Sequence, residues 1–170
     1  QLWEFMSLFL DSLAIAAQAL VGAALGAGSV RAAGSVARRV TVVSLVAAGL
    51  AAGVFAAGAS IIPRVFTSDA AILDAIGVPW WFFVAMLPIA GVVFALDGVL
   101  LGSGDAAFLR TATLAGALLG FLPLIWLSLV FDWGLAGIWS GLVVFMLVRL
   151  ATVVWRIRSG RWHRVGAETA

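Results

Sequence analysis

The chain has 170 residues, of which 64% are hydrophobic and 11% are charged, against about 45–50% and about 25% in an ordinary soluble domain. A soluble globule of this length cannot bury so much apolar surface, so the composition and the mean hydropathy of +1.18 indicate an integral membrane protein rather than a cytosolic enzyme. The net charge is only +2, and no basic stripe is interleaved with aromatic residues, which argues against a nucleic-acid-binding protein.

Five apolar segments follow one another along the chain, and each is long enough to cross a lipid bilayer. Their lengths of 20–24 residues match the ~20 residues that a helix needs to span the hydrocarbon core. Tryptophans near several segment ends are typical of an interfacial belt. The sequence therefore predicts an all-α polytopic transmembrane bundle in residues 1–155, followed by a basic cytoplasmic tail in residues 156–170. The predicted helices cover residues 3–26, 40–62, 78–101, 111–130 and 134–155.

Arginine is distributed unequally between the two ends of these helices. With five crossings, the first loop, the third loop and the tail share one side, and they hold eight arginines against one on the other side. Short cytoplasmic segments carry such an excess of positive charge, so we expect an external N-terminus and a cytoplasmic C-terminus. The eight residues are Arg31, Arg38, Arg39, Arg110, Arg156, Arg158, Arg161 and Arg164, and the single one is Arg64.

The start of the chain adds an expectation about its completeness. The first residue is Gln1 rather than methionine, and no signal peptide precedes the first helix. An external N-terminus without such a peptide is unusual for a complete protein. We therefore expect the chain to be a fragment whose first helix has partner helices upstream.

Glycine is frequent, and each predicted helix carries one G-x-x-x-G pair among the 19 glycines of the chain. Small residues at this spacing let two helix backbones approach closely in lipid, so the pairs predict tight packing, with flexibility or a cavity lining as the alternative. Pro88 and Pro123 lie inside the third and fourth helices, where proline removes a backbone hydrogen bond and permits a kink. The glycine pairs are Gly22/Gly26, Gly49/Gly53, Gly98/Gly102, Gly116/Gly120 and Gly137/Gly141.

A polar stripe runs along one face of the first helix and consists of Glu4, Ser7, Asp11 and Gln18. The spacings of three, four and seven residues place these side chains on one helical face. Asp11 lies about 12 Å below Trp3, where an uncompensated carboxylate costs several kcal/mol. The stripe therefore predicts a surface that faces a cavity or a partner helix, with Asp11 and Gln18 as the first candidates for an ion or substrate pathway and Glu4 beside them. A protonated, purely structural Asp11 is the alternative.

Asp97 is a second carboxylate within a predicted span, one turn before the end of the third helix. Arg149 lies six residues before Trp155 in the fifth helix, at a matching depth. The depths favour a structural ion pair between Asp97 and Arg149, and ion or proton handling by Asp97 is the alternative.

Catalytic motifs are missing from the sequence. There is no lysine to complete a phosphate-binding loop, and the single histidine, His163, lies in the tail, far from Ser12. The absence of cysteine and the single histidine also exclude a Cys- or His-clustered metal site. We therefore expect neither an enzyme nor a protein with a metal or an organic cofactor.

Two segments resemble the MATE (multidrug and toxic compound extrusion) transporters, and the DNA-damage-inducible protein F subgroup within them. LDSLAIAAQALVGAALGAG, residues 10–28, resembles the eighth helix of that family. LDGVLLGSGD, residues 96–105, followed by Leu109 and Arg110, resembles the end of the tenth helix and its loop. The order of the segments then corresponds to helices eight to twelve.

This resemblance implies a secondary antiporter in a bacterial inner membrane. Such proteins have twelve helices in two lobes, bind small organic substrates in a cleft between the lobes, and export them in exchange for protons or sodium. The chain would then lack its partners, the N-terminal lobe and helix seven. In other subgroups of the family a coupling aspartate lies on helix ten, and it aligns near Ala90, about two turns from Asp97. The resemblance therefore assigns no coupling role to Asp97.

Two other functions are compatible with the same helices. One is a flippase for lipid-linked precursors from the same superfamily, which favours arginines at mid-membrane that the five segments do not show. The other is a non-transporting membrane fragment or assembly module, as five helices without a first lobe suggest.

The arginine distribution makes a testable prediction about topology. Because the chain contains no cysteine, single cysteines at Ser35, Ser68 and Ser159 can be labelled with an impermeant thiol reagent in intact cells. We expect labelling at position 68 and protection at positions 35 and 159. The reverse pattern would contradict the predicted orientation.

Overall fold

Helices alone build the computed structural model, which describes residues 2–163. Four of the five membrane-length spans are single helices, and the fourth in chain order, Ala106–Val130, is a composite. The predicted all-α bundle with five transmembrane helices is therefore confirmed. The single helices are α1 (Leu2–Gly26), α2 (Val30–Ala57), α5 (Gly77–Gly102) and α8 (Gly134–Arg158), and the composite consists of α6 (Ala106–Gly116), η1 (Ala117–Phe121) and α7 (Leu122–Val130).

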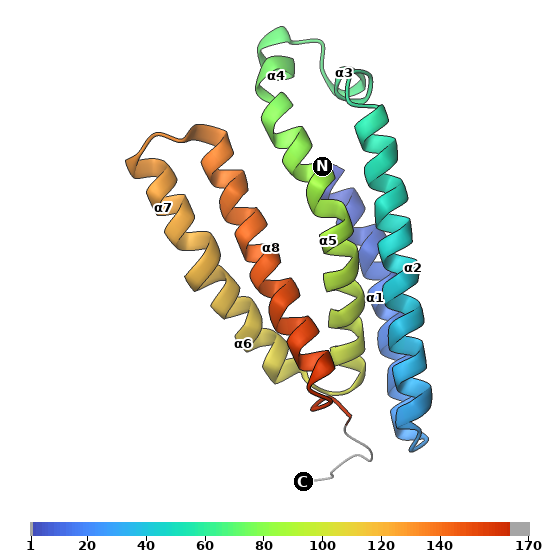
Figure 1. Ribbon diagram of the computed structural model, residues 1–170. Coiled ribbons are helices and arrows are strands. Elements are labelled where there is room, and N and C mark those ends of the chain that lie inside the picture. The colour runs from blue at the N-terminus through green and yellow to red at the C-terminus, as the bar shows by residue number, and fades with distance from the viewer. Residues whose placement is uncertain (1, 164–170) are drawn as a thin grey trace.

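Helix α5 occupies the centre of the bundle. Figure 1 shows α1 and α2 on one side of it, and α8 with the α6–α7 span on the other. In an 18-residue apolar stretch of each span, 56% of the residues of α5 are buried within the molecule, against 17–28% in the other four spans. The outer faces of these four helices are therefore open to lipid or to further protein.

Two short helices connect α2 to α5. They are α3 (Ile62–Phe66) and α4 (Ala70–Ala75), and they lie at the end of the bundle that also holds the α7–α8 turn (Figure 1). The α1–α2 turn, the α5–α6 turn and the end of α8 gather at the opposite end, which is the arginine-rich end of the sequence analysis.

Helix α2 differs from its predicted boundaries, since it begins at Val30 rather than at residue 40 and ends at Ala57 rather than at residue 62. The Oγ of Ser29 caps the helix by accepting a hydrogen bond of 3.2 Å from the backbone N–H of Ala32. Hydropathy marks only the part of a helix that lies in lipid, so the predicted helix did not include the polar first turns of α2. The predicted first loop is therefore mostly helix, and Arg31, Arg38 and Arg39 lie on α2.

The fourth span contains the π-helical turn η1, directly before Pro123. Proline has no backbone N–H to donate, and its ring crowds the preceding helical turn. A π-helical turn, which is wider than an α-helical one, makes room for the ring. The break permitted by Pro123 is thus a change of helix type. Pro88, in contrast, lies within an unbroken α5.

The backbones of α1 and α5 touch where α5 carries Gly98 and Gly102. A Cβ atom on Gly98 would lie 2.2 Å from the carbonyl oxygen of Ala14, and one on Gly102 would lie 2.4 Å from that of Gln18. Any side chain there would force the helices apart. Gly49, in another predicted pair, faces open space on α2, so the glycine pairs do not all mark helix contacts.

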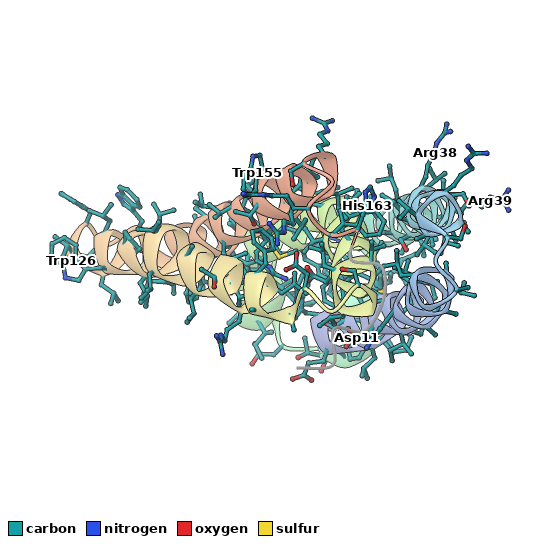
Figure 2. The ribbon with its side chains drawn as sticks, turned by 90° about the horizontal axis from the view of Figure 1, so that it is seen from below. Asp11, Arg38, Arg39, Trp126, Trp155 and His163 are labelled. Atoms are coloured by element: carbon teal, nitrogen blue, oxygen red, sulfur yellow. The ribbon has the colours of Figure 1, made fainter. Side chains whose placement is uncertain are left out.

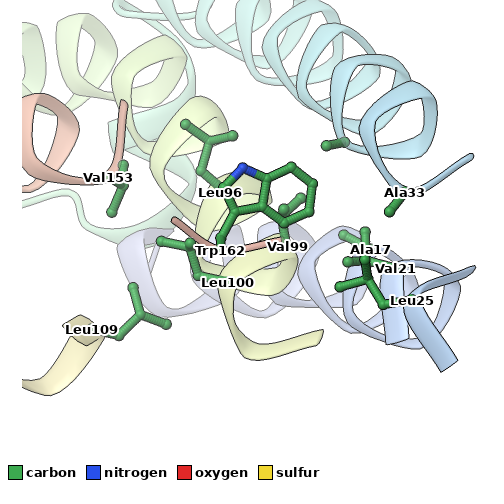
Figure 3. Close-up of a cluster of buried hydrophobic side chains, with 11 residues drawn as sticks. Ala17, Val21, Leu25, Ala33, Leu96, Val99, Leu100, Leu109, Val153 and Trp162 are labelled. Carbon is green, nitrogen blue, oxygen red and sulfur yellow. The ribbon is translucent and has the colours of Figure 1, made fainter. Parts of the chain in front are cut away.

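The arginine-rich end is closed by residues that the sequence analysis assigned to the tail. Helix α8 continues to Arg158, and Trp162 is only 2% exposed, in a cluster with Leu25 of α1 and Leu100 of α5 (Figure 3). The Trp162 indole N–H donates to the carbonyl oxygen of Ile157 at 3.1 Å. Helix α8 thus extends three residues past the predicted boundary at residue 155, and the predicted tail packs against the bundle at Trp162. Arg164 lies outside the described residues.

An ion pair ties the α5–α6 turn to α8 at the same end. The Nε of Arg156 donates to Oδ2 of Asp105 at 2.5 Å, and a second nitrogen donates to Oδ1 at 3.0 Å. Asp105 is 3% exposed, and the guanidinium lies 4.9 Å above the ring centre of Phe108. Arg156, assigned to the tail by sequence, thus belongs to the bundle.

We predict that Gly98→Ala destabilises the bundle by roughly 1–3 kcal/mol, because the new methyl group overpacks the α1–α5 contact. Gly49→Ala is the matched control, and it should be neutral or slightly stabilising, since nothing lies near its Cβ position. Thermal unfolding of the purified protein in detergent, followed by circular dichroism, compares the two. Equal unfolding temperatures for both variants would contradict the tight contact.

Candidate functional site

The polar stripe borders the buried face of α1. Leu10 and Ala14 point into the bundle, whereas Asp11 and Gln18 are exposed. Figure 2 shows Asp11 on α1 at the edge of the bundle, on the side away from Arg38 and Arg39. The two first candidates are therefore displayed on a surface that the described part of the chain does not cover.

The remaining stripe residues lie nearer the start of α1. Ser7 is half-buried, and its hydroxyl donates to the carbonyl oxygen of Trp3 at 2.7 Å. Glu4 is exposed, about two turns from Asp11. Glu4 and Ser7 thus extend the stripe toward the start of α1.

Asp97 and Arg149 form an ion pair between α5 and α8. The Arg149 guanidinium donates to Oδ2 of Asp97, to the Oγ1 of Thr113 and, at 3.2 Å, to the carbonyl oxygen of Leu109. The Arg149 side chain is 9% exposed and that of Asp97 is 22% exposed. The matching depths in the sequence thus correspond to a real contact, which also holds α6 through Thr113 and Leu109.

The α1–α5 contact brings Asp11 close to this pair. Ala14 lies about one turn from Asp11 and touches Gly98, which follows Asp97 directly. The two carboxylates, Asp11 and Asp97, are near enough to repel each other electrostatically. Oδ1 of Asp97 is buried and has no hydrogen-bond partner among the described residues. The site therefore joins one ion pair, a second carboxylate and an open acceptor atom.

An aromatic cavity of about 450 Å³ lies at the opposite end of the bundle. It is formed by the start of α1, the α3–α4 connection, the start of α5 and one residue of α8. The cavity was not predicted, although the i, i+3 spacing of Trp80 and Phe83 indicates a shared face of the helix. The residues around the cavity include Trp3, Phe66, Pro79, Trp80, Phe83 and Trp139.

Trp80 does not belong to an interfacial belt, contrary to the expectation from its place at a segment end. It is 4% exposed, and its indole N–H donates to the carbonyl oxygen of Phe55 at 3.2 Å. Its neighbour Trp81 is 57% exposed and remains in a position to meet the membrane interface. Adjacent tryptophans on a helix point in different directions, so one packs inward and the other outward.

The described residues offer carboxylates and an arginine but no cluster of three metal-binding side chains. This chemistry suits the handling of charge within a membrane. A match to a known family covers α1, α2, α5 and most of the span that follows α5: the MatE family model matches residues 1–127, well over half of the chain. The chain belongs to the MATE family. The motifs of α1 and α5 therefore identified the family correctly. MATE proteins are transporters rather than enzymes.

Similar MATE proteins come from Arabidopsis thaliana. Protein DETOXIFICATION 42 is 32% identical over 94% of the chain, and the chloroplastic Protein DETOXIFICATION 44 is 33% identical over 95% of it. Each alignment covers 31% of the relative, so the chain spans about a third of the length of these relatives. The crystal structure of the eukaryotic MATE transporter AtDTX14 superposes with a TM-score of 0.84 over 93% of this chain and 36% of that one, at 21% identity. That likeness supports the fold.

We predict that Asp97→Asn or Arg149→Met alone lowers the stability of this MATE protein by about 3–5 kcal/mol, because each leaves a buried charge without its partner. The double variant should lose clearly less than the sum of the two. Thermal unfolding in detergent measures all three.

Thr113→Val is the control, because it removes only one neighbour of the Arg149 guanidinium. It should cost about 0.5–1.5 kcal/mol. Additive losses in the double variant would mean that the two charges do not stabilise each other.

Proposed function

We propose that the chain forms part of a secondary active antiporter that exports drugs or other toxic organic compounds in exchange for protons or sodium. Its family membership supports transport. The exposed position of Asp11 within a membrane span supports the exchange of ions. This carboxylate lies about 12 Å along α1 from Trp3, is exposed, and lies about one turn from the Ala14–Gly98 contact with α5, where Gly98 directly follows Asp97.

An exposed Asp11 requires something polar against it. A carboxylate in hydrocarbon costs several kcal/mol, so this face of α1 needs water or protein rather than lipid tails. A cleft between two lobes supplies both. We therefore propose an N-terminal lobe and a helix seven as the partners of this bundle, with alternating access to the cleft between the lobes.

The aromatic cavity is the second element of the proposal. Its volume of about 450 Å³ lies within the range of small-molecule sites, and its lining is mostly apolar and aromatic. Small organic compounds with flat apolar groups fit such a lining. Asp11, Gln18 and Asp97 would then form the polar part of the pathway, with Glu4 between them and the cavity end.

The subgroup and the membrane location belong to the same proposal. The motifs in residues 10–28 and 96–105 support the DNA-damage-inducible protein F subgroup and, with it, a bacterial inner membrane. The arginines at the α1–α2 and α5–α6 end support a cytoplasmic C-terminus. Flippase activity is not favoured, since the Arg149 guanidinium is occupied by Asp97 and Thr113 rather than open to a lipid pyrophosphate.

We predict that Asp11→Asn in the full-length protein lowers dye efflux at least tenfold while membrane insertion and folding remain normal. Asparagine keeps the size and the hydrogen bonding of the side chain but cannot exchange a proton or bind a cation as a carboxylate does. Efflux of a fluorescent dye from cells, with the protein level measured in parallel, tests this expectation.

Ser12→Ala is the matched control, because Ser12 is exposed next to Asp11 and its hydroxyl bonds only its own helix, at the Phe9 carbonyl oxygen. Normal efflux by Asp11→Asn would contradict a role of Asp11 in ion exchange. If Asp11→Leu in addition loses folded protein, Asp11 is a structural residue.

A further inference from the structure

We propose that α2 carries a binding site for one anionic phospholipid, with Arg38 and Arg39 holding its phosphate. A hollow of about 580 Å³ on the outer face of α2 is lined by these arginines and by Ser35, Val42 and Val43. The proposal depends on the outer face of α2 alone and is independent of the transport function.

The two guanidinium groups are free to bind an anion. Figure 2 shows Arg38 and Arg39 projecting from α2 away from the rest of the bundle. The sequence contains no acidic residue between Asp11 and Asp69, and within residues 2–163 neither arginine takes part in an ion pair. Two neighbouring arginines offer planar donor pairs that match the oxygens of a phosphate.

The depth of the arginines matches the phosphate layer of a bilayer. Helix α2 has 28 residues and is about 42 Å long, whereas the hydrocarbon core is about 30 Å thick. Residues 40–63 are all uncharged, so this part of α2 occupies the core and Val30–Arg39 projects beyond it. Arg38 and Arg39 are thus the last charges before the hydrocarbon begins.

The surface beside the arginines suits acyl chains. Val42, Val43, Val46 and Leu50 are each more than half exposed and continue along α2 from the arginines into the core. Residues three and four apart share a helical face, so headgroup and acyl chain meet one continuous surface. A soluble phosphate would use only the arginines, whereas an anionic phospholipid uses the whole surface.

Binding of phosphatidylglycerol to the full-length protein tests the proposal. Phosphatidylcholine is the neutral comparison, and glycerol phosphate is the comparison without acyl chains. Native mass spectrometry of the protein in detergent counts the bound lipids and gives their affinity. We expect phosphatidylglycerol to bind more tightly than either comparison ligand.

The double variant Arg38→Gln/Arg39→Gln should weaken phosphatidylglycerol binding about 30-fold, as expected for two arginines near an anionic headgroup. Arg158→Gln/Arg161→Gln is the matched control, with the same change in net charge on exposed arginines at the same end of the bundle. Arg38→Lys/Arg39→Lys should retain part of the affinity.

Three results would overturn the proposal. Equal weakening by both glutamine variants would mean that net charge alone attracts the lipid. Equal affinity for phosphatidylcholine would remove the selectivity for an anion. Equal binding of glycerol phosphate would assign the arginines to a soluble anion instead of a lipid.

Discussion

The contact between the backbones of α1 and α5 is the constraint on which the rest of the bundle depends. Gly98 has no side chain where Ala14 presses against it, and its neighbour Asp97 is therefore drawn to the side of α1 that carries Asp11. With α1 so close, α5 is enclosed on that side, and α8 meets it on the other through Arg149. The absence of a Cβ atom at Gly98 thus allows Asp97 and Asp11 to be neighbours.

Polar and apolar chemistry are separated along the length of the bundle. An aromatic cavity occupies one end, and the Asp97–Arg149 pair with Asp11 lies further along. Arg38 and Arg39 of α2, which form no ion pair within residues 2–163, lie near the other end. A buried ion pair is more stable when its remaining donors and acceptors are hydrogen-bonded. Thr113 and the Leu109 carbonyl oxygen accept from Arg149, whereas Oδ1 of Asp97 has no hydrogen-bond partner among the described residues.

Much of this structure could be predicted from the sequence, because lipid imposes length and apolarity on every crossing. The five spans followed from apolar length, and opposite charges at matching depths favoured the Asp97–Arg149 contact. The start of α2 did not, since the Ser29 cap extends the helix by hydrogen bonds that hydropathy does not register. The burial of Trp80 and Trp162 could not be predicted for another reason: an indole is amphipathic, so it suits an interface as well as an interior in which a carbonyl oxygen accepts its N–H, as happens for both residues.

The π-helical turn in the fourth span has a consequence for comparing proteins of this kind. A turn closed by i→i+5 hydrogen bonds holds one residue more than an α-helical turn, so it acts as a single-residue insertion at Ala117–Phe121. Beyond it, every side chain of α7 is rotated by about 100° relative to a straight helix. Alignments with a relative whose helix is regular there need a one-residue gap, and without that gap equivalent positions in α7 would be assigned to the wrong face.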